Sequence, residues 1–106
     1  MKMITAIVQK KDGNEVGYAL RDAGFEFTKM ATVGGFLSAG NVTLLIGTED
    51  ERVDEALEIL RKNCRRRMEN VPAVLAAHAQ SVTYSTEVPV GGATVFVTDV
   101  LRFEKM

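Results

Sequence analysis

The order of two kinds of apolar spacing along the chain limits its fold more than any other feature. Helical spacing occurs twice, in Asn14–Ala23 and in the stripe formed by Val53, Ala56, Leu57, Leu60 and Cys64. Strand patterns occupy the segments around them, namely Met1–Gln9, Phe25–Thr32, Val42–Thr48, Thr83–Val90 and Ala93–Val97. The chain is therefore predicted to run strand, helix, strand, strand, helix and then a strand hairpin.

This order is that of a ferredoxin-like βαββαβ unit, an α+β fold in which both helices cover the same face of one sheet. The length of 106 residues fits a single domain, residues 1–106. An extra C-terminal strand hairpin is expected, because Gly91-Gly92 is a turn signal between Thr83–Val90 and Ala93–Val97. Met1–Gln9 is apolar at nearly every position, so the sheet face away from the helices also needs cover. A self-associated oligomer would supply it.

Several boundaries follow from local signals. Two capping-box patterns, Asp12 with Glu15 and Thr48 with Glu51, predict where the helices begin. Gly24 is expected to be the left-handed residue that follows the first helix.

One stretch has no clear pattern. The alanines of Met68–Ser81 fit either a short helix after Pro72 or a long loop. Pro89 makes the strand at Thr83–Val90 an edge strand, or ends it there. Residues 98–106 show neither the helical nor the strand spacing of apolar residues.

Composition and charge exclude several classes of function. The chain carries 13 Lys and Arg against 14 Asp and Glu, a net charge of −1, which argues against binding a nucleic-acid polymer. No apolar run approaches the roughly 20 residues of a membrane span, and the N-terminus enters a strand pattern and not a signal peptide. A single cysteine excludes an intramolecular disulfide and fits the cytoplasm. We expect neither membrane insertion nor a disulfide framework.

The residues that most often carry catalysis are scarce and poorly placed. Cys64 falls on the apolar stripe of the second helix, where a buried structural thiol is favoured over a nucleophile. The lone histidine, His78, has no acidic or serine neighbour, so a loop histidine is favoured over a catalytic one. Arg65-Arg66-Arg67 fits a helix C-terminus better than a phosphate site. No metal-ligand spacing occurs, and the prediction is a protein that is not an enzyme and holds no cofactor or metal.

The segment between Phe27 and Val42 is harder to explain as scaffold alone. Gly34, Gly35 and Gly40 cluster around the pair Phe36-Leu37, and consecutive glycines let a ligand approach the main chain. Phe36 offers a stacking face, and the amide of Asn41 can read an adenine edge. An adaptable loop with an exposed aromatic residue is an equally good interpretation on spacing alone.

The same segment carries a family resemblance. The string Thr28-Lys29-Met30-Ala31-Thr32-Val33-Gly34-Gly35-Phe36-Leu37-Ser38-Ala39-Gly40-Asn41 resembles the TKLATTGGFL-x-AGN signature of PII-like cyclic di-AMP receptor proteins. Agreement extends to the opening MKMITAIVQ, to Glu51-Arg52-Val53-Asp54-Glu55 and to Val90–Val97. The resemblance covers Met1 to about Cys64, and then Glu87 to about Val100.

The resemblance implies a PII-like subunit of a homotrimer that binds cyclic di-AMP between neighbouring subunits and signals to an unidentified downstream protein. Carried over residue by residue, the implied ligand contacts are Thr28, Gly35, Phe36, Leu37, Asn41 and Gly47, with Gly91, Gly92 and Ala93 as weaker candidates.

Three departures from the family pattern open a second hypothesis. Glu26 stands where known receptors carry an arginine, the segment 68–86 is shorter and alanine-rich, and the chain ends in Phe103-Glu104-Lys105-Met106. A carboxylate pointing into the site would repel phosphates. The alternative is therefore a PII-like protein retuned to another adenine nucleotide, or one that serves only as a protein-interaction surface.

Overall fold

The computed structural model describes residues 1–32, 40–72 and 85–106, and the account below concerns these residues. The strands are β1 (Lys2–Gln9), β2 (Phe27–Thr32), β3 (Asn41–Thr48), β4 (Arg67–Pro72), β5 (Ser85–Val90) and β6 (Ala93–Asp99). The helices are α1 (Lys10–Asp22), α2 (Val53–Cys64) and the short 3₁₀ helix η1 (Asp50–Arg52).

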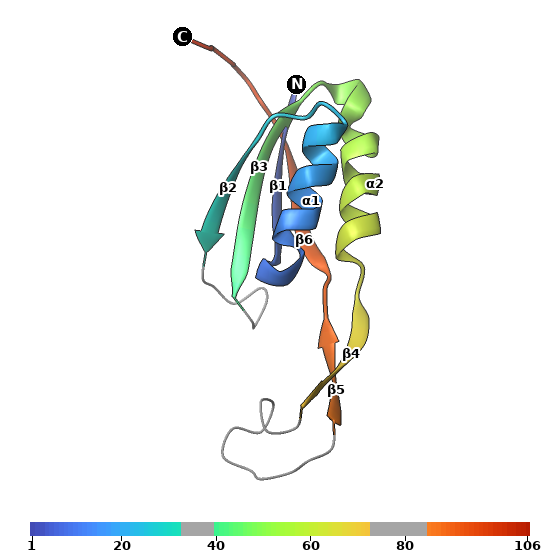
Figure 1. Cartoon of the computed structure of the whole chain (residues 1–106). Coiled ribbons are helices and arrows are strands. Elements are labelled where there is room, and N and C mark those ends of the chain that lie inside the picture. The colour runs from blue at the N-terminus through green and yellow to red at the C-terminus, as the bar shows by residue number, and fades with distance from the viewer. Residues whose placement is uncertain (33–39, 73–84) are drawn as a thin grey trace.

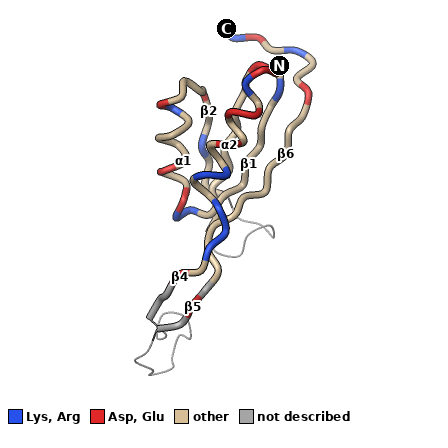
Figure 2. The backbone as a smooth tube through the Cα atoms, turned by 90° about the vertical axis from the view of Figure 1, so that its right-hand side faces the viewer, with Lys and Arg blue, Asp and Glu red and all other residues tan. Residues whose placement is uncertain are grey.

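A four-stranded antiparallel sheet of order β2-β3-β1-β6 forms the body of the molecule. Helix α1 connects β1 to β2 across β3, and α2 leads from β3 back towards β6 across β1. Both helices lie on the same side of the sheet (Figures 1 and 2). This arrangement confirms the predicted ferredoxin-like α+β fold.

The core lies between the helices and one face of the sheet. Alternation along β1 and β3 buries Ile4, Val8, Leu44 and Ile46 against the helices, and Leu20 of α1 is fully buried among them. Removing these side chains from water supplies the main stabilisation of the body, at roughly 1.5–3 kcal/mol for each large side chain.

The other sheet face carries no helix in the described part of the chain (Figure 2). Met30 of β2 and Phe96 of β6 are 40% and 46% exposed there. The sequence prediction that this face needs a further cover is consistent with that exposure, since apolar side chains on a sheet face gain stability when they are covered.

Strands β4 and β5 form a separate two-stranded sheet, which we call the arm. The arm projects from the end of the body where α2 and β6 meet (Figure 1). Strand β4 was not predicted, because residues 67–72 have no period-two apolar pattern and owe their structure to pairing with β5. Pro89 lies in β5, opposite Met68, and the arm has only edge strands, where proline is tolerated.

The Gly91-Gly92 prediction needs correction. The two glycines do not turn a hairpin between β5 and β6, because β5 pairs with β4 and β6 pairs with β1. Their φ angles of 84° and 87° instead let the chain pass from the arm into the body.

The capping predictions were wrong at both helix starts. Strand β1 runs directly into α1, which begins at Lys10 with Gln9 as N-cap and no side-chain cap hydrogen bond. Asp12 is therefore inside the first turn. Glu49, not Thr48, precedes η1, again without a side-chain cap.

The ends of the helices are partly as predicted. The left-handed Gly24, with φ 87°, follows α1 as expected. Helix α2 stops at Cys64, so Arg65-Arg66-Arg67 lies beyond its end and Arg67 opens β4. None of the described helices has the length and apolar character required to cross a membrane.

Candidate functional site

The residues expected to bind a ligand fall at three places in the fold. Gly35, Phe36 and Leu37 lie outside the described residues. Thr28 and Gly47 lie at one end of the sheet, Asn41 lies at the other end of β3, and Gly91, Gly92 and Ala93 lie where the arm joins the body. The single chain therefore does not gather the described candidates into one pocket.

Thr28 and Gly47 share a groove of about 410 Å³, called the Thr28 groove below. Strand pairing explains why they meet: Thr28 lies opposite Leu45 on β3, and Gly47 lies opposite Met3 on β1. The groove is lined by Met1, Met3, Glu26, Phe27, Thr28, Leu45, Gly47, Val100 and Phe103. An apolar lining with a few polar groups is typical of small-molecule sites.

Gly47 leaves the backbone of β3 open inside this groove. A Cβ atom placed on Gly47 would meet only the methyl group of Met1, at 3.7 Å, which is ordinary contact. Packing therefore does not require glycine at this position. The absence of a side chain does let a ligand approach the main chain closely.

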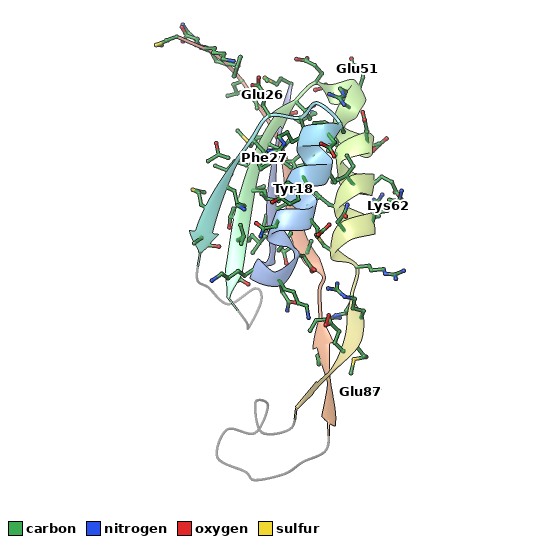
Figure 3. The ribbon with its side chains drawn as sticks, viewed as in Figure 1. Tyr18, Glu26, Phe27, Glu51, Lys62 and Glu87 are labelled. Atoms are coloured by element: carbon green, nitrogen blue, oxygen red, sulfur yellow. The ribbon has the colours of Figure 1, made fainter. Side chains whose placement is uncertain are left out.

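The charges around the Thr28 groove are mostly paired. The Met1 amino group lies 2.8 Å from Asp50 Oδ1, and this hydrogen bond raises the pKa of the amino group and lowers that of the carboxyl. Glu26 stands at the end of β2 nearest the N-terminus (Figure 3), with its side chain 85% exposed. Its carboxylate faces Lys105 Nζ at 3.8 Å. The sequence left open which way Glu26 points, and the structure places it on the lining of the groove.

Asn41 lies at the opposite end of β3, between Gln9 of β1 and Thr32 of β2. It is 6% exposed and lines a second groove of about 450 Å³ that also contains Lys10, Asn14 and Lys29. Lys29 Nζ donates a hydrogen bond to Asn14 Oδ1 at 3.0 Å. Lys29 lies opposite Leu44 on the helix side of the sheet, so it approaches this end of β3 from the face opposite to the Asn41 side chain.

Asn41 and Gly47 are six positions apart on the extended strand, which amounts to roughly 20 Å. Both residues project on the sheet face away from the helices, because β3 alternates and Val42, Leu44 and Ile46 occupy the helix side. A ligand of dinucleotide size reaches both ends only if a second subunit brings its own copy of one end to the other.

The junction of arm and body is held by a network that the sequence did not indicate, and which we call the arm root. Asp12 is 4% exposed, and its Oδ1 accepts a hydrogen bond from Arg67 Nη2 at 2.8 Å. This bond raises the pKa of the Arg67 guanidinium. Arg67 also lies 3.5 Å from Glu69, which is paired with Lys11. The two partners Asp12 and Arg67 are 55 positions apart, so no local spacing signals their contact.

The glycines at the arm root are structural in this fold. The Gly91 amide donates to Gln9 Oε1 at 2.6 Å, and the Gly92 amide donates to the Cys64 carbonyl. A Cβ on Gly91 would collide with the carbonyl oxygen of Arg65. Gly92 and Ala93 line a third groove, of about 470 Å³, beside α2. The structure thus gives Gly91 a packing role in addition to any role towards a ligand.

The remaining chemical candidates carry no site in the described chain. Cys64 is 1% exposed, and burial raises the pKa of its thiol to about 12, which keeps it protonated and unreactive. Burial of this thiol confirms the structural interpretation. His78 lies outside the described residues. Arg67 is committed to Asp12, at the end of the sheet away from Thr28. Among residues 1–32, 40–72 and 85–106, no cluster of His, Cys, Asp or Glu is suited to hold a metal ion.

Comparison with known proteins identifies a similar solved structure and a matching protein family. A solved structure described as a functionally unknown protein from Pediococcus pentosaceus ATCC 25745 is 41% identical and superposes with a TM-score of 0.81, covering 99% of this chain and 96% of that one. A family model described as "Cyclic-di-AMP receptor" matches residues 1–106. The match spans the body, the arm and the tail alike, and the chain therefore belongs to the cyclic-di-AMP receptor family.

Proposed function

We propose that this protein is a non-enzymatic, cytoplasmic signal receptor that binds cyclic di-AMP at the interfaces between subunits of a homotrimer. The observation that carries the proposal is the division of the candidate residues between the two ends of β3. Thr28 and Gly47 share a groove at one end, and Asn41 lies roughly 20 Å away at the other. Two neighbouring subunits can combine the two ends into one site, whereas one subunit cannot.

The uncovered sheet face supports the oligomeric part of the proposal. Met30 and Phe96 expose apolar surface on that face, and closed symmetric assembly is the usual way in which small domains cover such a surface. Ligand binding at the interfaces then shifts the population of loop conformations and alters contacts with an unidentified downstream protein.

Titration calorimetry with cyclic di-AMP tests the ligand, and light scattering coupled to size exclusion tests the assembly. We expect saturable binding by a species of about three subunits. Gly47→Ala is the informative variant, because its Cβ meets only Met1 in the free protein yet narrows the approach to the backbone of β3. It should weaken binding about tenfold or more while leaving the fold intact. The absence of binding heat at high micromolar ligand contradicts the proposal.

A second candidate function rests on Glu26. Its carboxylate lines the Thr28 groove, where it repels phosphate groups, and this favours a site retuned to another adenine nucleotide or a surface that binds only protein. A thermal-shift panel of mononucleotides and cyclic dinucleotides separates the candidates, since a ligand that binds the folded state raises the melting temperature. The receptor proposal requires the largest shift with cyclic di-AMP and no turnover of the ligand during incubation.

A further inference from the structure

The C-terminal tail, residues 100–106, places a cation beside the Thr28 groove. Phe103 lines the groove itself, and Phe103 and Lys105 both line an adjoining hollow of about 340 Å³. Glu26 lines both spaces, so it stands at the boundary that the tail crosses. The 3.8 Å contact between Glu26 and Lys105 therefore lies where the groove and the adjoining hollow meet.

The first residues of the tail are tied to the body, which limits where Lys105 can reach. The Val100 amide donates to the Met1 carbonyl at 3.1 Å, and Asp99 is paired with Lys2. Farther along, Arg102 is paired with Glu104 at 2.8 Å. Lys105 is thus held on a short tether whose origin is fixed beside the groove.

The other cations near the groove are bound more tightly to partners. The Met1 amino group pairs with Asp50 at 2.8 Å. Arg52 lies over the ring of Phe25 at 4.0 Å and donates to the Ala23 carbonyl at 2.7 Å. By contrast, the Glu26–Lys105 separation is the longest of the ion pairs found in the described chain, and both side chains are largely exposed. Lys105 is therefore the cation that costs least to redirect.

We propose that Glu26 and Lys105 form a charge clasp: Lys105 exchanges the Glu26 carboxylate for a phosphate group of the ligand when an anionic dinucleotide enters the Thr28 groove. The clasp rests on the proposed receptor function. It would explain how the Thr28 groove selects among ligands by their charge. Glu26 opposes the entry of anions, and Lys105 offsets that opposition by contacting the ligand directly. The affinity for the dinucleotide then depends on two opposite charges: Glu26, which directly precedes β2, and Lys105, which lies on the tail.

The test compares four variants by titration calorimetry with cyclic di-AMP at low and high salt. Glu26→Gln removes the repulsion and should tighten binding by about threefold. Lys105→Met should weaken binding by about tenfold and flatten the dependence of affinity on salt, because a charge-assisted contact to phosphate is lost. Lys105→Arg keeps the charge and should restore most of the affinity. Lys62→Met is the matched control, since Lys62 is an exposed lysine on α2 away from Glu26 (Figure 3).

The outcomes separate the clasp from the receptor function. If the wild type binds and Lys105→Met binds equally well with the same salt dependence, the clasp is wrong and the receptor function stands. If Glu26→Gln binds cyclic di-AMP where the wild type does not, Glu26 excludes this ligand and Lys105 does not offset it, so the clasp is wrong and the wild-type ligand is a different one. If neither binds, both proposals fail.

Discussion

The two ends of the four-stranded sheet are built on different principles. At the arm-root end, Asp12 is 4% exposed and paired with Arg67, and the Gln9 side chain accepts the amide of Gly91. At the Thr28 end, the side chain of Glu26 is 85% exposed and its partner Lys105 stands on a tail. One end is locked by buried polar contacts, and the other presents polar groups to solvent.

The topology explains the difference. At the arm root the chain crosses between elements three times, from β1 to α1, from α2 to β4 and from β5 to β6. Those crossings bury backbone and side-chain polar groups together, and buried polar groups need partners within the protein. At the Thr28 end the surroundings are loops, η1 and the tail, and the Glu26–Lys105 pair there is largely exposed, so it can exchange partners at little cost. The fold thus separates the buried polar contacts of the arm root from the candidate binding groove at the other end of the sheet.

Breaking the Asp12–Arg67 pair should have the largest effect on stability. Arg67→Met leaves the buried Asp12 carboxylate without its cation, and we expect a loss of about 2–3 kcal/mol, less than for a fully buried pair because Arg67 is partly exposed. The measurement is urea unfolding. Arg61→Met, which removes an exposed pair with Glu58 on α2, is the matched control and should cost about 0.5 kcal/mol or less. Equal losses in the two variants would show that the arm root is not locked by this pair.

Substitution by alanine should destabilise the protein more at Gly91 than at Gly92, the two glycines of the arm root. Both have positive φ, so alanine at either position is strained by about 1–2 kcal/mol. Gly91→Ala also drives a Cβ into the Arg65 carbonyl, whereas a Cβ on Gly92 meets nothing within 4 Å. Gly91→Ala should therefore be the more destabilising by at least 1 kcal/mol in thermal or urea unfolding. The reverse order would contradict the close approach of the two chain segments.

Acid should remove a stabilising charge interaction from the arm-root end. The hydrogen bond from Lys11, with Arg67 nearby, lowers the pKa of Glu69 below its usual 4.5. A carboxyl with a lowered pKa stabilises the folded state above the unfolded-state value and loses that contribution as the pH falls through the folded-state value. Glu69→Gln should therefore show a smaller drop in urea midpoint than the wild type when the pH falls below 4.5. An equal drop in Glu69→Gln and in the wild type would contradict a stabilising role for this charge interaction.

The smallest change in stability is expected at the Thr28 end. Gly47→Ala adds a methyl group into open space beside Met1, so the free energy of unfolding should stay within about 0.5 kcal/mol of the wild type. Urea unfolding measures this free energy. The same measurement shows whether Gly47→Ala is folded for the binding experiment. A loss comparable with that of Gly91→Ala would mean that the groove is more tightly packed than its lining indicates.

Local patterns predicted most of the body. The apolar stripe of α2, the strand at β3 and the left-handed Gly24 all occur in the structure as expected, because each depends on residues within a few positions of one another. Long-range contacts escaped prediction. The local sequence predicts a helix cap at Asp12 and a hairpin turn at Gly91-Gly92. In the structure Asp12 pairs with Arg67, and β5 pairs with β4 and not with β6.

The amino-acid sequence specifies the chemical groups of the candidate site: a hydroxyl at Thr28, a backbone without a side chain at Gly47, an amide at Asn41 and a carboxylate at Glu26. Their arrangement depends on the tertiary structure. It put Thr28 and Gly47 into one groove through strand register, kept Asn41 at the far end of the same strand, and brought Lys105 from the tail to Glu26. The physical reason is that hydrophobic period specifies which face a residue occupies, whereas strand pairing and chain crossings decide which distant residues share that face.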